Sequence, residues 1–277
     1  MDVLVTGANG TIGQALRDYL EPESAYTFTW FDKQDHPNLE TVVGDTTDRD
    51  AVFDAAQGTD AIVHLAMADY LGASPDRSVA YHEAFPEPIK EICYVLEAAR
   101  ENDAKVIYAS SNHAVGLYEV RNAPDIYYPD FDLLVDHTVP SCPDSRYGAM
   151  KVLSEGMGEL AAEVHDVPFY SLRIGAVRGP EFDHPFGDAE QRVERGELER
   201  GSDRYHELVA RMKALWCSRR DISQLVDRCL QDEDVSYDVF YGISQSDRNW
   251  LDIAHAQEVL GYVPEDDAEA WDSPPSS

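Results

Sequence analysis

Short apolar runs alternate with helical patterns along most of the chain. The first apolar run covers residues 3–5, and the next segment, residues 12–20, carries apolar residues at helical spacing. Further strands are predicted at residues 26–31, 41–43, 61–65, 105–109 and 168–174, and further helices at residues 49–57, 89–100 and 147–164. This order predicts an α/β fold with a Rossmann-type, doubly wound parallel sheet and helices on both faces. Ligands are then expected at the carboxyl ends of the strands.

Two segments interrupt this order. Residues 117–146 contain four prolines and several aromatic residues, and we predict that they form a long ordered loop over the site. Residues 178–206 are rich in Arg, Glu, Asp and Gly, which predicts a partly mobile insertion or a lid. Beyond them, helices are predicted at residues 208–216, 221–229 and 253–260, and a strand at residues 237–243. Gly261 is expected to end the last of these helices.

The charge of the chain is strongly negative. Its 53 Asp and Glu residues against 22 Lys and Arg residues give a formal net charge of −31. The acidic residues are spread over the whole sequence, which is typical of a surface that stays hydrated in concentrated salt. We therefore expect a halophilic protein. No basic patch is present to neutralise phosphates, so nucleic acid is not an expected partner.

Apolar runs and cysteines narrow the cellular setting. The longest apolar runs fall far short of the roughly 18–20 residues that a membrane helix needs. The four cysteines show no CxxC or metal-ligand spacing, so we expect free thiols, no metal site and a cytoplasmic protein. Cys93 and Cys229 lie in helical patterns and are expected to be small buried apolar residues.

Residues 6–13 read Thr-Gly-Ala-Asn-Gly-Thr-Ile-Gly and follow the first strand directly. Glycines allow a tight turn and a close backbone approach, and the following helix offers free amide groups to a pyrophosphate. A strand, a glycine-rich turn and a helix in this order predict a dinucleotide site. The alternative is a glycine-rich turn that binds nothing. The predicted cofactor contacts in this segment are Gly7, Asn9, Gly10, Thr11, Ile12 and Gly13.

Asp32 ends the second predicted strand, about twenty residues beyond the glycine turn. An acid at this position accepts hydrogen bonds from the ribose hydroxyls and repels a 2′-phosphate, which predicts NAD rather than NADP. Lys33 beside it is a cation that could tolerate the extra phosphate. Asp45, after the third strand, either reaches the adenine edge or caps the helix at 49–57. Leu65 and Ala66, at the end of the fourth strand, are also predicted to contact the cofactor.

Tyr147 and Lys151 are four residues apart at the start of a predicted helix, so their side chains share one face. We expect the Lys151 ammonium to lower the pKa of Tyr147, as a general base for alcohol oxidation requires. A strand that ends at Ser110 and Ser111 precedes them. Ser111 is the better candidate for orienting a substrate hydroxyl, while Ser110 is expected to cap or pack.

Together these motifs resemble the extended short-chain dehydrogenase/reductase superfamily, also described as the NAD-dependent epimerase/dehydratase family. The stretch Tyr-Ala-Ser-Ser-Asn-His-Ala-Val-Gly at residues 108–116 is similar to uronate dehydrogenases and to haloarchaeal NAD-dependent glucose-6-phosphate dehydrogenase. Segments at residues 172–175, 215–221, 239–244 and 259–264 agree with that branch. The resemblance covers nearly the whole chain and implies oxidation of the C1 hydroxyl of a cyclic sugar to a lactone, with NAD as hydride acceptor.

The resemblance also implies roles for particular residues. Ser111, Tyr147 and Lys151 correspond to the catalytic triad. Substrate contacts correspond to Asp69, Asn112, His113 and Arg211, the last for an anionic group. From the residues alone, Arg211 could instead form a surface ion pair and His113 could bond a loop carbonyl. Arg173, at the end of a strand, is expected to brace the loop.

Departures from the family pattern also occur. Met150 replaces a hydroxyl residue before the lysine, Ala176 stands where a hydroxyl residue can occur, and Pro88 lies where an Asn would brace the lysine. The bracing hydrogen bond to Lys151 is then expected to be absent. An acid at Asp69 would repel an anionic sugar.

These expectations lead to a predicted domain division and to a predicted function with two alternatives. Residues 1–175 form the predicted NAD-binding domain with the catalytic residues, and residues 176–271 form a small C-terminal substrate-binding lobe. The lobe includes the insertion 178–206 and gives strand 237–243 to the sheet, and residues 272–277 form a disordered tail. The predicted function is an NAD-dependent sugar dehydrogenase. A nucleotide-sugar epimerase or dehydratase with retained NAD and a non-catalytic NAD sensor are the alternatives, and a homodimer through helices 89–100 and 147–164 is expected.

Overall fold

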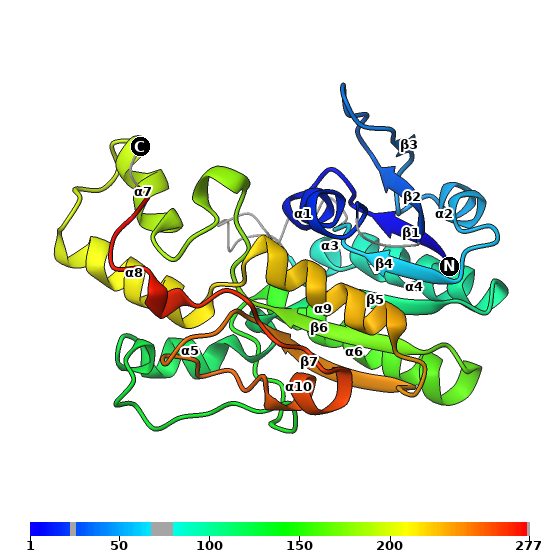
Figure 1. The fold of residues 1–277 in the computed structure, drawn as a ribbon. Coiled ribbons are helices and arrows are strands. Elements are labelled where there is room, and N and C mark those ends of the chain that lie inside the picture. Colours follow the sequence, from blue (N-terminus) through cyan, green and yellow to red (C-terminus); the bar gives the residue numbers. More distant parts are fainter. Residues whose placement is uncertain (23–25, 68–79, 276–277) are drawn as a thin grey trace.

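A single parallel sheet forms the centre of the molecule (Figure 1). The computed structural model describes residues 1–22, 26–67 and 80–275. In this part of the chain seven strands pair in the order β3-β2-β1-β4-β5-β6-β7, and every pairing is parallel. The strands are β1 (Asp2–Thr6), β2 (Thr27–Asp32), β3 (Val42–Val43), β4 (Ala61–His64), β5 (Lys105–Ser111), β6 (Phe169–Ile174) and β7 (Tyr237–Gly242). This strand order is that of a Rossmann fold, so the predicted fold class is confirmed.

Helices cover both faces of the sheet, because alternate residues of each strand point to opposite sides. Val3 and Val5 of β1 belong to a core cluster with residues of α1 and α9. Leu4 between them belongs to a second cluster, with residues of α2, α4 and α6. The helices are α1 (Thr11–Tyr19), α2 (Arg49–Ala55), α3 (Tyr81–Ala84), α4 (Pro86–Glu101), α5 (Gly116–Asn122), α6 (Arg146–His165), α7 (Gly187–Glu194), α8 (Asp203–Leu215), α9 (Arg219–Gln231) and α10 (Ala254–Leu260).

The segment 117–146 is not only a loop, as the sequence predicted. It contains most of α5, which begins at Gly116, and the 3₁₀ turn η3 (Asp125–Tyr127). Ile126 and Tyr127 are buried against Leu215 and Trp216, at the end of α8. This tertiary contact stabilises a turn and a short helix that the proline content concealed.

The segment 178–206 also folds more regularly than its composition suggested. It contains α7 and the first turn of α8, which begins five residues before the predicted position because Ser202 caps it. Phe186, Ala189, Tyr205 and Leu208 form a small separate core there. In Figure 1 these two helices lie beside the C-terminal segment, at the end of the molecule away from α2.

Two smaller expectations have mixed outcomes. Cys229 is fully buried, as predicted, but Cys93 is half-buried because it borders a shallow pocket between α4 and α6. Gly261 ends α10 in the left-handed conformation, with φ of 65°, as predicted. None of the helices in the described residues is long and apolar enough to span a membrane.

Candidate active site

The glycine turn between β1 and α1 brings the backbone close to the end of β4. Gly7 has φ of +71°, and a Cβ there would lie 2.6 Å from the backbone nitrogen of Ala66. A Cβ on Gly13 would lie 2.3 Å from the carbonyl oxygen of Ala8. Gly10 caps α1 without a side chain, so no side-chain oxygen satisfies the amides of the first helical turn. These amides form a site suited to an anionic group.

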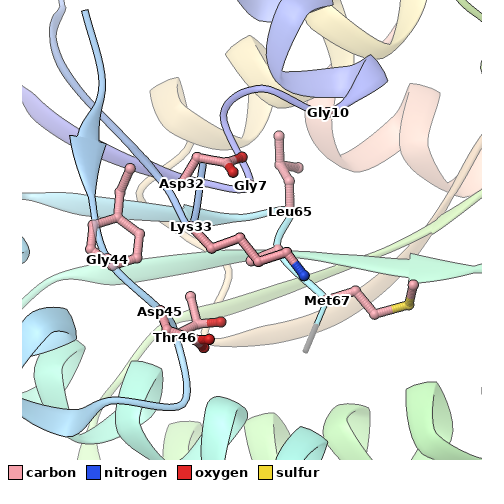
Figure 2. A pocket seen from close by; sticks show the side chains of 11 residues that line it. Gly7, Gly10, Asp32, Lys33, Gly44, Asp45, Thr46, Leu65 and Met67 are labelled. Atoms are coloured by element: carbon pink, nitrogen blue, oxygen red, sulfur yellow. The ribbon is translucent and has the colours of Figure 1, made fainter. Parts of the chain in front are cut away.

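Asp32 is fixed beside this turn. One carboxylate oxygen accepts a hydrogen bond of 3.0 Å from the backbone amide of Asn9, and the other accepts one of 3.0 Å from Gln34. In Figure 2 the Asp32 carboxylate lies next to Gly7 and Gly10, and the Lys33 side chain extends across the pocket towards Met67. The lining residues of this first pocket are Gly7, Gly10, Phe31, Asp32, Lys33, Gly44, Asp45, Thr46, Leu65, Ala66 and Met67.

Asp45 does not cap the following helix, so that alternative is wrong. Asp48 is the N-cap of α2 and accepts hydrogen bonds from the amides of Asp50 and Ala51. Asp45 instead accepts from the amide and hydroxyl of Thr47, at 2.9 and 2.8 Å, in a local turn. Because α2 begins at Arg49, Asp45 is too far from its first turn to cap it. Asp45 lies in the pocket wall.

A second pocket contains the predicted catalytic residues. Ser111 ends β5, and Tyr147 and Lys151 lie in the first two turns of α6, which begins after the cap Ser145. The lining residues are Gly7, Gly10, Thr11, Ile12, Gly13, Leu65, Met67, Ala109, Ser110, Ser111, Tyr147, Lys151, Ile174, Gly175, Val177 and Arg178. Four residues, Gly7, Gly10, Leu65 and Met67, border both pockets. The two pockets therefore form one groove across the carboxyl ends of β2, β1, β4, β5 and β6.

Burial governs the electrostatics of the candidate catalytic pair, Tyr147 and Lys151. Burial raises the pKa of Tyr147, and the hydrogen bond with Ser111 opposes this shift. The Lys151 ammonium lies 5.5 Å from the centre of the Tyr147 ring and donates to the carbonyl oxygen of Ala109 at 2.7 Å. The expected lowering of the Tyr147 pKa by Lys151 is therefore not found. Burial also lowers the pKa of Lys151 to about 8, while Glu91 and Glu155 raise it.

A buried ion pair lies one helical turn beyond Lys151, and the sequence reasoning missed it. The Glu155 carboxylate accepts from Arg173 Nε at 3.0 Å and Nη2 at 2.8 Å, and from Ser110 Oγ at 2.5 Å. Both charged side chains are only 4% exposed. Arg173 also donates to Ser141 Oγ at 2.9 Å and so braces the loop as predicted. An acid four residues after Lys151, on the same helix face, was the available signal.

The predicted substrate residues have different surroundings. Asn112 is buried in η2 (Asn112–Val115), with its side-chain oxygen 3.4 Å from Ser111 Oγ. His113 bonds the Asp144 carboxylate at 2.7 Å rather than a loop carbonyl, because the start of α6 brings Asp144 beside it. The His113 ring lies 5.7 Å from the Tyr147 ring, centre to centre. Asp69 lies outside the described residues.

Arg211 and Arg178 differ in their relation to the groove. Arg211 lies on α8 and pairs with the Glu119 carboxylate of α5, with Nε 2.5 Å from Oε1. It is not among the described residues that line the second pocket, whereas Arg178 is. Sequence reasoning did not single out Arg178. Its position four residues after the end of β6 was the available signal, because the sheet edge there faces the ligand.

The comparisons with known proteins agree with a nucleotide-binding role for this groove. A model of the NAD dependent epimerase/dehydratase family matches residues 3–206, which contain the glycine turn, Asp32 and all three candidate catalytic residues. The chain belongs to this family.

Relatives of the epimerase/dehydratase family match almost the entire chain. The NAD-dependent glucose-6-phosphate dehydrogenase of Haloferax volcanii is 31% identical over 277 residues, which cover 96% of this chain and 94% of the relative. The uronate dehydrogenase of Pseudomonas syringae pv. tomato is 30% identical over 274 residues, with 97% and 83% covered. The crystal structure of glucuronic acid dehydrogenase from Chromohalobacter salexigens has a TM-score of 0.72 at 28% identity and covers 98% of this chain and 86% of that one.

These likenesses confirm several predictions. The resemblance to the extended short-chain dehydrogenase/reductases, the Rossmann-type fold, NAD as the cofactor and the class of NAD-dependent enzyme are all confirmed. The Haloferax relative also fits the halophilic character expected from the charge. The individual site residues stay predictions.

Proposed function

We propose that this chain oxidises the C1 hydroxyl of a cyclic sugar, a hexose phosphate or a uronate, to a lactone with NAD. The observation that carries this proposal is the single groove that holds Ser111, Tyr147 and Lys151 at one end and Asp32 at the other. The names of the relatives, a glucose-6-phosphate dehydrogenase and uronate dehydrogenases, support the substrate class. Hydride transfer from an alcohol is the chemistry that this residue set serves.

The residues of the groove fit NAD. Side chains at Gly7 or Gly13 would collide with backbone, so the tight turn needs glycine, and the amides at the start of α1 have no side-chain cap and can receive a pyrophosphate. Asp32 is held by two backbone amides, and as a carboxylate it can still accept hydrogen bonds from ribose hydroxyls. Leu65, Ala66 and Asp45 complete the wall on the adenosine side. When bound, NAD supplies the acceptor for the hydride that leaves C1 of the sugar.

The residues of this chain position the sugar hydroxyl and accept its proton. Ser111 donates a hydrogen bond to the substrate oxygen, and Tyr147 accepts the hydroxyl proton as the C1–O bond becomes a carbonyl. Tyr147 must be ionised to accept this proton, and Lys151, held by Ala109, provides a positive charge that favours the phenolate before the transfer. The sugar carbon loses two electrons and one hydrogen as hydride, and the hydroxyl proton passes through Tyr147 to water. Asn112 and His113 are proposed contacts for the sugar hydroxyls.

The chain is further proposed to form a homodimer in the cytoplasm. Leu160 and Val164 on α6 are 53% and 60% exposed, and α6 borders an apolar pocket shared with Leu96 and Cys93 of α4. A second copy of these two helices would cover this surface. The four cysteines are free, which suits a reducing compartment. Sedimentation of the protein and of its Leu160→Glu variant tests the dimer, because only the wild-type chain should sediment as a dimer.

The test of function is an absorbance assay at 340 nm in concentrated KCl. The purified protein is mixed with NAD and with glucose 6-phosphate, glucuronate, galacturonate, glucose or arabinose. Formation of NADH and of the matching lactone with an anionic sugar is the expected result. No NADH with any sugar would contradict the proposal. NAD retained through purification, with conversion of a nucleotide sugar and no net NADH, would identify the epimerase class instead.

A further inference from the structure

The histidine His113 stands next to both residues at which the sugar is proposed to react. Its backbone amide donates to Ser111 Oγ at 3.2 Å. Its ring meets the Tyr147 ring edge to face, with 5.7 Å between the ring centres and an angle of 75° between the planes. His113 is not itself among the described residues that line the second pocket, but a sugar held by Ser111 and Tyr147 lies within reach of a ring that packs on Tyr147.

Asp144 contacts the far edge of this ring. Its Oδ2 lies 2.7 Å from Nδ1 of His113, and its side chain is 11% exposed, compared with 37% for His113. Burial alone would raise the pKa of Asp144, but hydrogen bonds with His113 and Ser145 bring it below its ordinary value. Asp144 is therefore a carboxylate, which can only accept hydrogen bonds. The hydrogen of this contact lies on Nδ1 of His113.

Two glycines give this pair its space. A Cβ on Gly116 would lie 2.3 Å from Oδ2 of Asp144, and a Cβ on Gly148 would lie 2.2 Å from the carbonyl oxygen of His113. Cys142 forms two backbone hydrogen bonds of 2.9 Å, one with η2 and one with the start of α5. The backbone on both sides therefore fixes the approach of Asp144 to His113.

The contact decides what the other ring nitrogen offers to a ligand. A neutral imidazole carries one hydrogen, so a hydrogen on Nδ1 leaves Nε2 with a lone pair. Because Asp144 covers the Nδ1 edge of His113, the exposed part of the ring includes the edge with Nε2. That edge is an acceptor of hydrogen bonds.

The second pocket is short of acceptor side chains for a sugar. In the described part of its lining, the polar side chains are hydroxyl groups and cations, from Thr11, Ser110, Ser111, Tyr147, Lys151 and Arg178. No carboxylate or amide side chain belongs to this described lining. Each sugar hydroxyl has a hydrogen to donate, and a donor left without an acceptor weakens binding. An acceptor at Nε2 of His113 supplies what these residues lack.

We infer that Asp144 is a positioning residue that keeps the hydrogen of His113 on Nδ1, so that Nε2 accepts a hydrogen bond from a sugar hydroxyl. This inference rests on the proposed function. It adds the direction of one hydrogen bond to the sugar and the residue that sets this direction. Asp144 acts through His113 and does not touch the sugar.

The test compares Asp144→Asn, His113→Asn and the double variant with the wild-type protein. An amide can donate to Nδ1 as well as accept from it, so Asp144→Asn keeps the size of the side chain but no longer forces the hydrogen onto Nδ1. Asp238→Asn is the matched control, because Asp238 bonds Nε2 of His255 at 2.8 Å. That pair lies near the amino end of β7, away from the carboxyl ends that border the groove.

NMR spectra of the ¹⁵N-labelled protein show which ring nitrogen carries the hydrogen, and the His113 signals are assigned by their absence in His113→Asn. At about pH 8 we expect a hydrogen on Nδ1 and none on Nε2 in the wild-type protein. In Asp144→Asn part or all of this hydrogen should move to Nε2. A hydrogen on Nε2 of the wild-type ring, or an unchanged ring in Asp144→Asn, would overturn the inference.

Steady-state rates with glucose 6-phosphate and glucuronate and titration with NAD measure the effect on function. We expect kcat/KM of Asp144→Asn to fall about tenfold, mainly through a higher KM, because one hydrogen bond to the sugar is lost. Its NAD affinity, and all values for Asp238→Asn, should change less than about threefold. The double variant should lose little beyond His113→Asn, since Asp144 acts through His113. An unchanged KM in Asp144→Asn, or additive losses in the double variant, would contradict the assigned role.

The spectra also separate this inference from the proposed function. If the wild-type protein turns over no sugar, the proposed function fails, and the protein is titrated with each sugar in the presence of NADH. A shift of the Nε2 signal of His113 in the wild-type protein that Asp144→Asn weakens then supports the inference. The absence of any shift overturns it.

Discussion

The ammonium of Lys151 donates a buried hydrogen bond of 2.7 Å to the carbonyl oxygen of Ala109. Ala109 lies on β5 two residues before Ser111, so this bond joins α6 to the strand that carries the serine. A bracing interaction to the lysine therefore exists although Pro88 stands where an Asn was expected. The ammonium also lies 4.7 Å from the centre of the Tyr108 ring, which further restricts its position.

The acid Glu91 is expected to keep Lys151 protonated. Glu91 is buried on α4. The largest influence on the pKa of Lys151 is the burial of Lys151, and the next is Glu91, which raises that pKa. Glu91→Gln removes a negative charge, so the pKa of Lys151 should fall below about 8. The alkaline limb of the kcat/KM profile should then move to lower pH by about half to one unit. Glu97→Gln, on the exposed side of α4, is the matched control, and an upward shift or none in Glu91→Gln would contradict the prediction.

Tyr147 is expected to be indispensable for turnover but not for cofactor binding. Tyr147→Phe removes the proton acceptor, so kcat should fall by about 10²–10⁴-fold, while the Kd for NAD changes little. Rates at 340 nm and titration with NAD measure the two effects. Tyr128→Phe, at an exposed tyrosine, should behave as the wild-type protein. Turnover that survives in Tyr147→Phe would reject the proposed mechanism.

Removal of one partner of the buried ion pair should be costly. Arg173→Met leaves the Glu155 carboxylate buried without its cation, and we expect the free energy of unfolding to fall by about 3–5 kcal/mol. The double variant Glu155→Leu/Arg173→Met should recover most of that loss, because it buries no unpaired charge. Urea unfolding at constant salt gives both values. A loss below about 1 kcal/mol in the single variant would show that the pair contributes little.

Asp32 is expected to set the preference for NAD over NADP. Asp32→Asn keeps the shape of the side chain but removes the charge that repels a 2′-phosphate. The Kd for NAD should rise about tenfold, since a hydrogen bond to a charged group is lost, and binding of NADP should tighten. Fluorescence titration with both cofactors measures the change, with the exposed Asp35→Asn as control. An unchanged ratio of the two affinities would remove Asp32 from cofactor selection.

The low pKa of the buried His64 predicts that the protein loses stability in mild acid. Nδ1 of His64 shares a hydrogen bond of 2.7 Å with the Thr6 hydroxyl, and burial, assisted by Lys151, lowers the pKa of His64 from 6.5 to about 3. Between these values the unfolded chain binds a proton that the folded chain does not, so stability decreases as the pH falls below about 6.5. At pH 5 the contribution is about 2 kcal/mol.

Comparison with His64→Asn isolates this effect. The difference in unfolding free energy between the wild-type protein and the variant should change by about 2 kcal/mol between pH 7 and pH 5. Measurement in constant, concentrated KCl keeps the surface carboxylates screened in both proteins. A constant difference across this range would show that His64 takes up its proton at the same pH in the folded and unfolded states.

Much of the fold was predictable, because it depends on local features. Apolar periodicity located all seven strands of the sheet, with most boundaries within two residues. The turn at Gly7 needs a positive φ and a close approach to Ala66, which only glycine allows, so the turn is visible in the sequence. Asp32 and the pair Tyr147 and Lys151 could be found because strand ends and helical spacing fix where such side chains meet.

Interactions between distant segments could not be predicted in this way. Arg211 and Glu119 are 92 residues apart, and their pairing follows from the packing of α8 on α5. The core that Phe186 and Tyr205 form could not be predicted either, because the segment around them is rich in charged residues. The sequence by itself determined the alternation of strands and helices and the glycine turn, and it supplied the candidate catalytic residues, since these features depend on neighbours within a few residues. Only the tertiary structure decided which arginine lines the groove, because that depends on which carboxylates the folded chain brings to Arg178 and Arg211.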